Sequence, residues 1–320
     1  MKFMWFWLIT VASASLWEEW KKNHRRIYAN EEDECFRYDI WSNNYAIIQA
    51  HNNLTNRTFE MGLNQFSDLT PKEFKDRMAS CVVTPHSDFP STICAQINAQ
   101  PILSNKLFDL PPEIDWRTQG AVTSIKDQGD CGSCWAFSSV AALEGYWKVT
   151  NKTLLDLSEQ QLVDCSKSEG NYGCEGGLMD QAFNYTRQKG ACTQKSYPYN
   201  GTTQHCAASK CQSMIQTTGC ANLWTGDVQT TEKVLQYMVT QQPVAVAVDA
   251  GSWQNYQSGV LDDSGCYFQL DHGVAVVGYS DNYWIVKNSW GTTWGENGYI
   301  RIVRGKNMCG IAELPSVPIG

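Results

Sequence analysis

The sequence carries little positive charge and has no long apolar run, and each absence excludes a class of function. Its 25 Lys and Arg residues are outnumbered by 33 Asp and Glu residues, which gives a formal net charge of -8. A nucleic-acid-binding protein needs a basic patch, so nucleic acid is not an expected partner. The apolar run at residues 3–11 is shorter than the roughly 20 residues of a membrane-spanning helix. There is also no internal repeat.

The N-terminus predicts a secretory signal peptide at residues 1–14. Lys2 precedes the apolar run, and Ala12, Ser13 and Ala14 offer small residues for cleavage. Thirteen cysteines suit the oxidising secretory route, and their odd number leaves at least one thiol unpaired. Five Asn-x-Ser/Thr triplets are candidate glycosylation sites: Asn53, Asn56, Asn151, Asn184 and Asn200.

The most informative motif is Cys131-Gly-Ser-Cys134-Trp135, which opens an apolar stretch with helical spacing. The positive end of a helix favours a thiolate at Cys134, and a nearby histidine oriented by a third group makes that thiolate a nucleophile. His272 lies 138 residues after Cys134, and Asn288 follows it. The cysteine motif with this downstream His and Asn resembles the papain/cathepsin signature, and the resemblance implies that Cys134 is the nucleophile, His272 the base and Asn288 the group that orients the base.

Three other interpretations of Cys131 and Cys134 remain possible from the residues alone. They are a plain structural disulfide, a thiol oxidoreductase centre of the C-x-x-C kind, and half of a zinc site. Zinc would need a second cysteine pair with metal spacing, and Cys206 and Cys211 fit that spacing poorly.

Ahead of this motif, six residues recur at spacings that place them on one face of a helix: Asp33, Arg37, Trp41, Asn44, Ile48 and Asn52. They resemble the ERFNIN pattern of cathepsin L-type propeptides, with Asp33 and Trp41 as departures. Residues 62–68, Gly-Leu-Asn-Gln-Phe-Ser-Asp, resemble the G-x-N-x-F-x-D motif of the same propeptides. With the cysteine motif and Leu110–Arg117, which resembles a mature N-terminus, these patterns identify the chain as similar to the papain family.

The resemblance implies a papain-like α+β fold with two lobes, one helical and one resembling a β-barrel, behind an N-terminal helical propeptide. The expected domains are residues 1–14, 15–109 (propeptide) and 110–320 (mature peptidase). Residues 81–109 lose periodicity and are interpreted as an extended linker. Helices are expected at residues 134–149, 158–164 and 178–188, and strands at residues 244–248, 273–278, 283–287 and 299–303. Cys134 thus lies in the helical half and His272 in the β half, which predicts a site in the cleft between them.

The resemblance also assigns roles to other residues. Gln128 would stabilise the oxyanion together with the Cys134 backbone N–H, and Trp290 would shield the bond between His272 and Asn288. Substrate would be bound by Gly176, Gly177, Leu178, Met179, Ala247, Leu270, Leu314 and Trp290. The second residue before the cut (P2) would enter a pocket lined by five apolar residues of this set: Leu178, Met179, Ala247, Leu270 and Leu314. This lining implies a preference for Leu, Val or Phe over Arg at P2. Implied disulfides are Cys131–Cys174, Cys165–Cys206 and Cys266–Cys309, with Cys211–Cys220 and Cys81–Cys94 as further pairings.

The resulting prediction is a cysteine endopeptidase made as an autoinhibited zymogen, with neither cofactor nor metal. Its expected partners are protein or peptide substrates, its own propeptide and cystatin-type inhibitors, and its expected location is a lysosomal or digestive vacuole or the extracellular space. Asp68 and residues 31–34 suggest that acid loosens the propeptide by neutralising carboxylates. Two alternatives are a cathepsin-type exopeptidase, disfavoured because residues 190–219 hold no histidine-rich insertion, and a catalytically silent binding protein.

Overall fold

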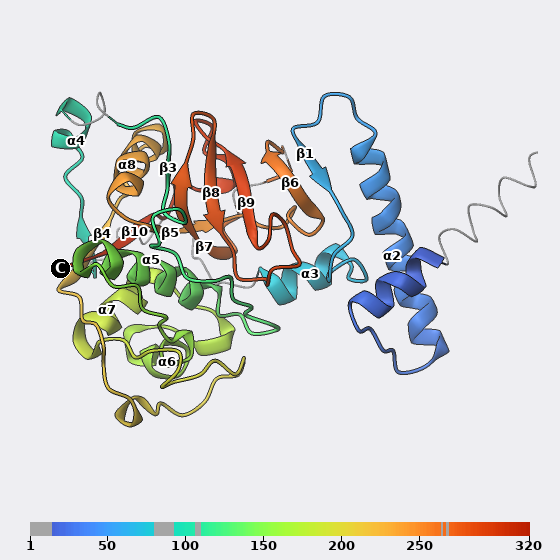
Figure 1. The fold of residues 1–320 in the computed structure, drawn as a ribbon, viewed down its shortest axis with the longest axis horizontal. Coiled ribbons are helices and arrows are strands. Elements are labelled where there is room, and N and C mark those ends of the chain that lie inside the picture. Colours follow the sequence, from blue (N-terminus) through green and yellow to red (C-terminus); the bar gives the residue numbers. More distant parts are fainter. Residues whose placement is uncertain (1–14, 80–92, 106–109, 264, 267–268) are drawn as a thin grey trace, which may run out of the picture.

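The computed structural model describes residues 15–79, 93–105, 110–263, 265–266 and 269–320, so the predicted signal peptide at residues 1–14 lies outside the described residues. Figure 1 shows the N-terminal unit, residues 15–79, to one side of a larger C-terminal domain, residues 110–320. The N-terminal unit contains a helix at residues 15–23, α2 (Glu31–Asn52), β1 (Phe59–Met61) and α3 (Pro71–Met78). Among the helices of the described residues, none has both the length and the apolar character needed to cross a bilayer.

Helix α2 confirms the predicted helix and its face. Asn30 caps it, because its side-chain oxygen accepts a hydrogen bond from the Asp33 backbone N–H. Trp41, Asn44 and Ile48 are buried, and Trp41 packs in an aromatic cluster with Trp17 and Trp20 from the preceding helix. The regular spacing in the sequence therefore corresponds to the face on which the N-terminal unit packs.

The first half of the C-terminal domain is helical, as predicted. It contains α5 (Cys134–Asn151), α6 (Glu159–Cys165) and α7 (Met179–Lys189), each within two residues of its expected position. Ser158 lies just before α6 and caps it through the Gln161 backbone N–H. Short 3-10 helices lie at Ser166–Glu169, Gly173–Glu175, Ala208–Lys210 and Met308–Gly310.

The second half forms most of one sheet with the order β1-β6-β9-β8-β7-β5-β10-β4-β2. The four predicted strands are β5 (Val244–Val248), β7 (His272–Tyr279), β8 (Tyr283–Lys287) and β9 (Tyr299–Val303). Adjacent pairs among them are antiparallel, and their side chains are largely buried. The sequence did not predict the remaining elements, which are β3 (Ile114–Asp115), β4 (Gly219–Asn222), β6 (Tyr256–Leu261), β10 (Ser316–Ile319) and α8 (Val228–Gln241).

The linker prediction needs a correction. Residues 93–105, called here the linker segment, contain β2 (Ala95–Gln96) and α4 (Gln100–Asn105), and β2 pairs with β4 of the C-terminal domain. These elements were missed because each is too short to show periodicity.

The disulfides confirm three pairings and overturn two. Cys131–Cys174, Cys165–Cys206 and Cys266–Cys309 are formed as expected. The pairings Cys211–Cys220 and Cys81–Cys94 are wrong, because the structure contains Cys192–Cys211 and Cys94–Cys220. Sequence order does not determine which cysteines the fold brings together.

Candidate active site

Cys134 is the first residue of α5, in the positive end-field that favours a thiolate. The loop before it is held by the Cys131–Cys174 disulfide, which excludes a Cys131–Cys134 pair and with it the C-x-x-C redox interpretation. The Cys134 sulfur is itself disulfide-bonded in this structure. The structure thus represents an oxidised form, in which this sulfur is not a nucleophile.

His272 begins β7, and its ring lies beside Asn288. Its Nε2 lies 2.7 Å from Asn288 Oδ1, whereas its buried Nδ1 has no hydrogen-bond partner among the described residues. A Cβ at Gly273 would lie 3.2 Å from the carbonyl carbon of Cys134, so a larger residue would push β7 away from α5. The structure therefore places His272 beside Asn288 and β7 against the start of α5, and the second imidazole nitrogen has no partner among the described residues.

The imidazole lies among buried aromatic rings. Its centroid is 4.7 Å from the Trp290 ring and 6.2 Å from the Trp253 ring. Burial lowers the pKa of His272 to about 4, although the bond to Asn288 favours the protonated ring. In this state the ring is therefore neutral at ordinary pH, and water must reach it before an imidazolium is favoured.

Gln128 is buried beside the nucleophile. Its Nε2 donates to the Cys131 carbonyl oxygen at 3.1 Å, and its Oε1 accepts from Ser289 Oγ at 2.7 Å. An amide has a second N–H, so these bonds orient Gln128 and still leave a donor for a substrate oxygen.

Five of the residues predicted to bind substrate lie in or beside one apolar region. Leu178, Met179 and Leu314 line one pocket, and Ala247 and Leu270 belong to the same apolar cluster. The pocket also contains Asp180, Asn222 and Ser316, which the sequence analysis missed. Gly177 precedes the pocket, and a Cβ there would lie 2.8 Å from the Trp135 ring. The pocket is thus less apolar than the sequence predicts.

The N-terminal unit packs directly on the aromatic residues around His272. Phe66 and Phe74 contact the Trp290 ring edge-on, with centroids 5.7 and 5.3 Å away. Gln65 Nε2 donates to the Trp290 carbonyl oxygen at 2.7 Å, and Asn64 Nδ2 donates to the Gln254 carbonyl oxygen at 2.7 Å. The G-x-N-x-F-x-D motif therefore supplies residues of this contact, whereas Phe74 had no sequence signal.

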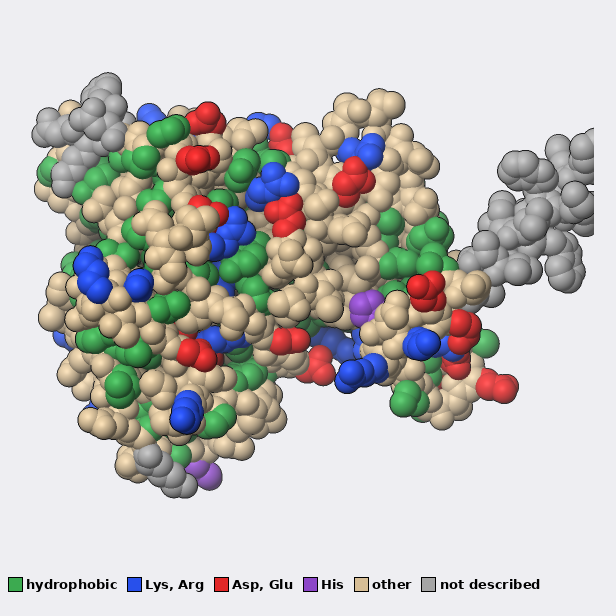
Figure 2. Space-filling model, in the orientation of Figure 1, with side chains coloured by type: hydrophobic (Ala, Val, Ile, Leu, Met, Phe, Trp, Pro, Cys, Tyr) green, Lys and Arg blue, Asp and Glu red, His purple; other side chains and the backbone are tan. Residues whose placement is uncertain are grey.

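Charged residues of both partners also meet at this contact. A pocket at the junction is lined by Arg26 and Arg77 on one side and by Asp127 and Asp130 on the other. Figure 2 shows basic and acidic side chains close together at the neck between the N-terminal unit and the C-terminal domain. Residues of opposite charge therefore line the two sides of this junction.

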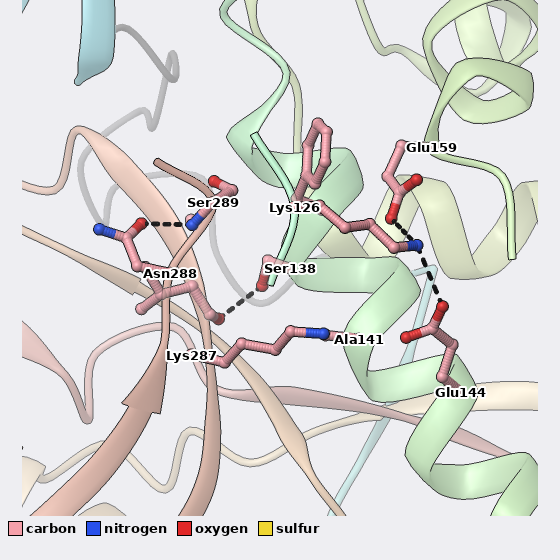
Figure 3. Close-up of a pocket in the computed structure, with 11 residues that line it drawn as sticks. Lys126, Ser138, Ala141, Glu144, Glu159, Lys287, Asn288 and Ser289 are labelled. Carbon is pink, nitrogen blue, oxygen red and sulfur yellow. Dashed lines mark hydrogen bonds and ion pairs between the residues drawn. The ribbon is translucent and has the colours of Figure 1, made fainter. Parts of the chain in front are cut away.

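A buried charge cluster, absent from the sequence predictions, lies between the two lobes. Figure 3 shows Lys126 bridging Glu144 and Glu159, with Nζ–Oε1 distances of 3.2 and 2.7 Å, while Lys287 points toward the same cavity from β8. Burial alone would lower the pKa of Lys126, but the two carboxylates outweigh burial and raise it. Burial raises the pKa of Glu159 to about 7. These groups lie far apart in sequence, so no local pattern could reveal them.

The described residues contain no group of three or more His, Cys, Asp and Glu side chains arranged to hold a metal ion. Cys206 and Cys211, considered above for zinc, are each engaged in a disulfide.

Comparisons with known proteins agree with this geometry. Residues 110–319 match the papain family cysteine protease domain, and residues 17–74 match the cathepsin propeptide inhibitor domain. The chain is 43% identical to cathepsin L of Sarcophaga peregrina over 94% of its own length and 91% of that protein. It is 41% identical to the cathepsin L-like proteinase of Fasciola hepatica over 95% and 93% of the two chains. The digestive procathepsin L 3 of the Tenebrio molitor larval midgut superposes with a TM-score of 0.85 at 37% identity, over 96% of this chain and 99% of that chain.

Proposed function

Since the chain belongs to the papain family, as a cathepsin L-like cysteine endopeptidase with its own propeptide inhibitor domain, we propose that Cys134, His272 and Asn288 carry its reaction. The observation that supports this assignment is the 2.7 Å contact between His272 Nε2 and Asn288 Oδ1, which leaves the other imidazole nitrogen without a partner. The unused nitrogen can exchange a proton with the Cys134 thiol, and the Asn288 oxygen holds the ring in place.

The reaction starts from a reduced Cys134 thiolate and a protonated His272. The thiolate attacks the scissile carbonyl carbon, and the oxyanion is stabilised by the Gln128 amide and the Cys134 backbone N–H. His272 then gives its proton to the departing amine, which leaves an acyl-enzyme. Water gives a proton to His272, attacks the thioester and releases the acid, which restores the thiolate.

The zymogen is inactive for two reasons in this proposal. The docked N-terminal unit packs on Trp290, which lies beside His272, and the oxidised Cys134 cannot attack. Activity therefore needs both a reductant and removal of the N-terminal unit. The secretory location, the glycosylation and the cystatin-type inhibitors stay predictions, and the number of disulfides supports an oxidising route.

The P2 residue is proposed to enter the pocket of Leu178, Met179, Ala247, Leu270 and Leu314. Leu314 offers no partner to a buried guanidinium, which favours Leu, Val or Phe over Arg. Asp180 lies in the same pocket lining, so an observed Arg preference would point to its carboxylate.

The test is hydrolysis of two fluorogenic peptides that differ only in Leu or Arg at P2. Wild-type zymogen is matured at acid pH with reductant, and Cys134→Ala is matured by an added protease that is then removed. We expect activity only in the wild type, with kcat/KM at least tenfold higher for Leu. Inactivity of both, with the N-terminal unit removed, would favour the silent binding protein. Cleavage restricted to chain ends would favour the exopeptidase, and equal rates for Leu and Arg would refute the pocket assignment.

A further inference from the structure

The linker segment is covalently joined to the C-terminal domain. Cys94 and Cys220 form a disulfide across 126 residues of sequence, although they lie on opposite sides of the predicted maturation site near Leu110. Both cysteines are buried, at 6% and 3% exposure, so a reductant in solution has little access to the bond. The segment also lies between the two matched domains, which end at residue 74 and begin at residue 110.

Main-chain pairing reinforces the disulfide. Strand β2 runs parallel to β4, with Ala95 opposite Ala221, and the Ile97 backbone N–H donates to the Asn222 carbonyl oxygen at 3.0 Å. The linker segment thereby adds an edge strand to the sheet of the C-terminal domain.

The helical end of the linker segment is packed as well. Ile102 of α4 is 6% exposed and lies in the same apolar core as Val234 and Leu235 of α8. Detaching the segment would expose this side chain and uncover its partners on α8. Figure 1 shows α4 beside α8, on the far side of the domain from α2.

The linker segment also reaches the substrate pocket. Asn222, whose carbonyl oxygen it binds, lines that pocket with Leu178 and Leu314. Cys94 itself belongs to the apolar cluster that contains Met179 and Ala247. A segment anchored here supports the pocket wall from behind.

We propose that the linker segment stays bound to the mature protease through Cys94–Cys220, so that the active enzyme has two chains and the smaller one supports the substrate pocket. The proposal rests on the maturation cleavage and on the pocket assignment made above. Hydrolysis of one peptide bond N-terminal to Cys94 and one C-terminal to Asn105 each consumes a water and leaves the S–S bond intact. No oxidant or reductant is required.

The first experiment does not depend on the enzyme's own activity. Cys134→Ala zymogen is blocked with N-ethylmaleimide, cleaved by an added protease without reductant and weighed intact by mass spectrometry. We expect the mature mass plus a peptide that contains Cys94, and release of this peptide after denaturation and reduction. A mature chain without the peptide would overturn the proposal, whether or not the wild-type enzyme cleaves substrates.

The second experiment tests the role at the pocket. The double variant Cys94→Ser/Cys220→Ser, cleaved by an added protease, should lose the linker segment without any reductant, and both proteins are assayed afterwards with reductant present. For the peptide with Leu at P2 we expect KM to rise severalfold and kcat to stay within about twofold of wild type. An unchanged KM after proven loss of the segment would refute the pocket role, and retention of the segment by the double variant would show that the disulfide is not the tether.

Discussion

Two parts of the propeptide contact the C-terminal domain in opposite ways. The N-terminal unit is held by aromatic contacts, hydrogen bonds and charge pairs, such as Lys75 Nζ at 3.4 Å from Asp271 Oδ2. The linker segment is held by the Cys94–Cys220 disulfide and a strand pair. Contacts of the first kind separate when solution conditions change, whereas a buried disulfide persists. The N-terminal unit is therefore held in a way that allows its release from the C-terminal domain, whereas the linker segment is held in a way that keeps it bound.

The largest expected effect comes from Phe74→Ala, which removes a fully buried ring from the contact with Trp290. Truncation of a buried Phe costs about 3–5 kcal/mol. In a Cys134→Ala background, we expect an added protease to remove the N-terminal unit about a hundredfold faster, while the linker segment stays attached. Ile27→Ala is the control, since Ile27 is 94% exposed and should leave the rate unchanged. Equal rates for the two variants would show that the aromatic contact does not hold the N-terminal unit.

A smaller effect is expected from acid acting on His272. Its folded pKa of about 4 is below the ordinary value of 6.5, so the unfolded chain binds more protons between these values and stability falls as pH falls through this window. We expect Cys134→Ala zymogen to lose about 2–3 kcal/mol between pH 7 and pH 4.5 relative to Cys134→Ala/His272→Gln. Burial raises the pKa of Asp271 to about 6, so this residue makes the protein more stable as the pH falls. Both variants contain Asp271, so its effect cancels in the difference between them. Parallel urea-denaturation curves across this pH range would contradict the prediction.

The sequence predicted those parts of the site that depend on local patterns. Cys134 starts α5 and His272 starts β7, so helix and strand periodicity placed the motifs correctly. Helix α8 was missed because Val228, Thr230 and Thr231 are β-branched and lower the helical propensity of its first turn. The remaining start signal was the Asp227 cap, which is weak evidence for a helix on its own.

Features made by contacts between distant segments could not be predicted from local patterns. The cluster of Lys126, Glu144 and Lys287 joins a loop, a helix and a strand, so it exists only once the lobes have packed. The same reason explains the wrong pairings for Cys94 and Cys220. The acidic residues suspected of sensing pH also differ in role, because Asp68 is buried against Arg26, whereas Glu31 and Glu32 are exposed.

The smallest expected effect on stability comes from breaking a charge pair within the N-terminal unit. Glu73 Oε1 lies 2.9 Å from Arg37 Nη1 and thereby joins α3 to α2. Burial alone would raise the pKa of Glu73, but hydrogen bonds from Thr70 and the charge of Arg37 outweigh it and lower the pKa. A lowered pKa means that this stability is present above the ordinary Glu value and is lost as pH falls.

Glu73→Gln keeps a side-chain oxygen to cap α3 and removes only the charge. In Cys134→Ala zymogen we expect it to cost about 1 kcal/mol of unfolding free energy at pH 7, and the difference from the parent to shrink as the pH falls below the ordinary Glu pKa. Asp76→Asn is the matched control, because its pair with Lys72 is exposed and its loss should leave the unfolding free energy nearly unchanged. A pH-independent cost for Glu73→Gln would assign the effect to packing, and the charge pairs would then have no part in the acid sensitivity that separates the N-terminal unit from the linker segment.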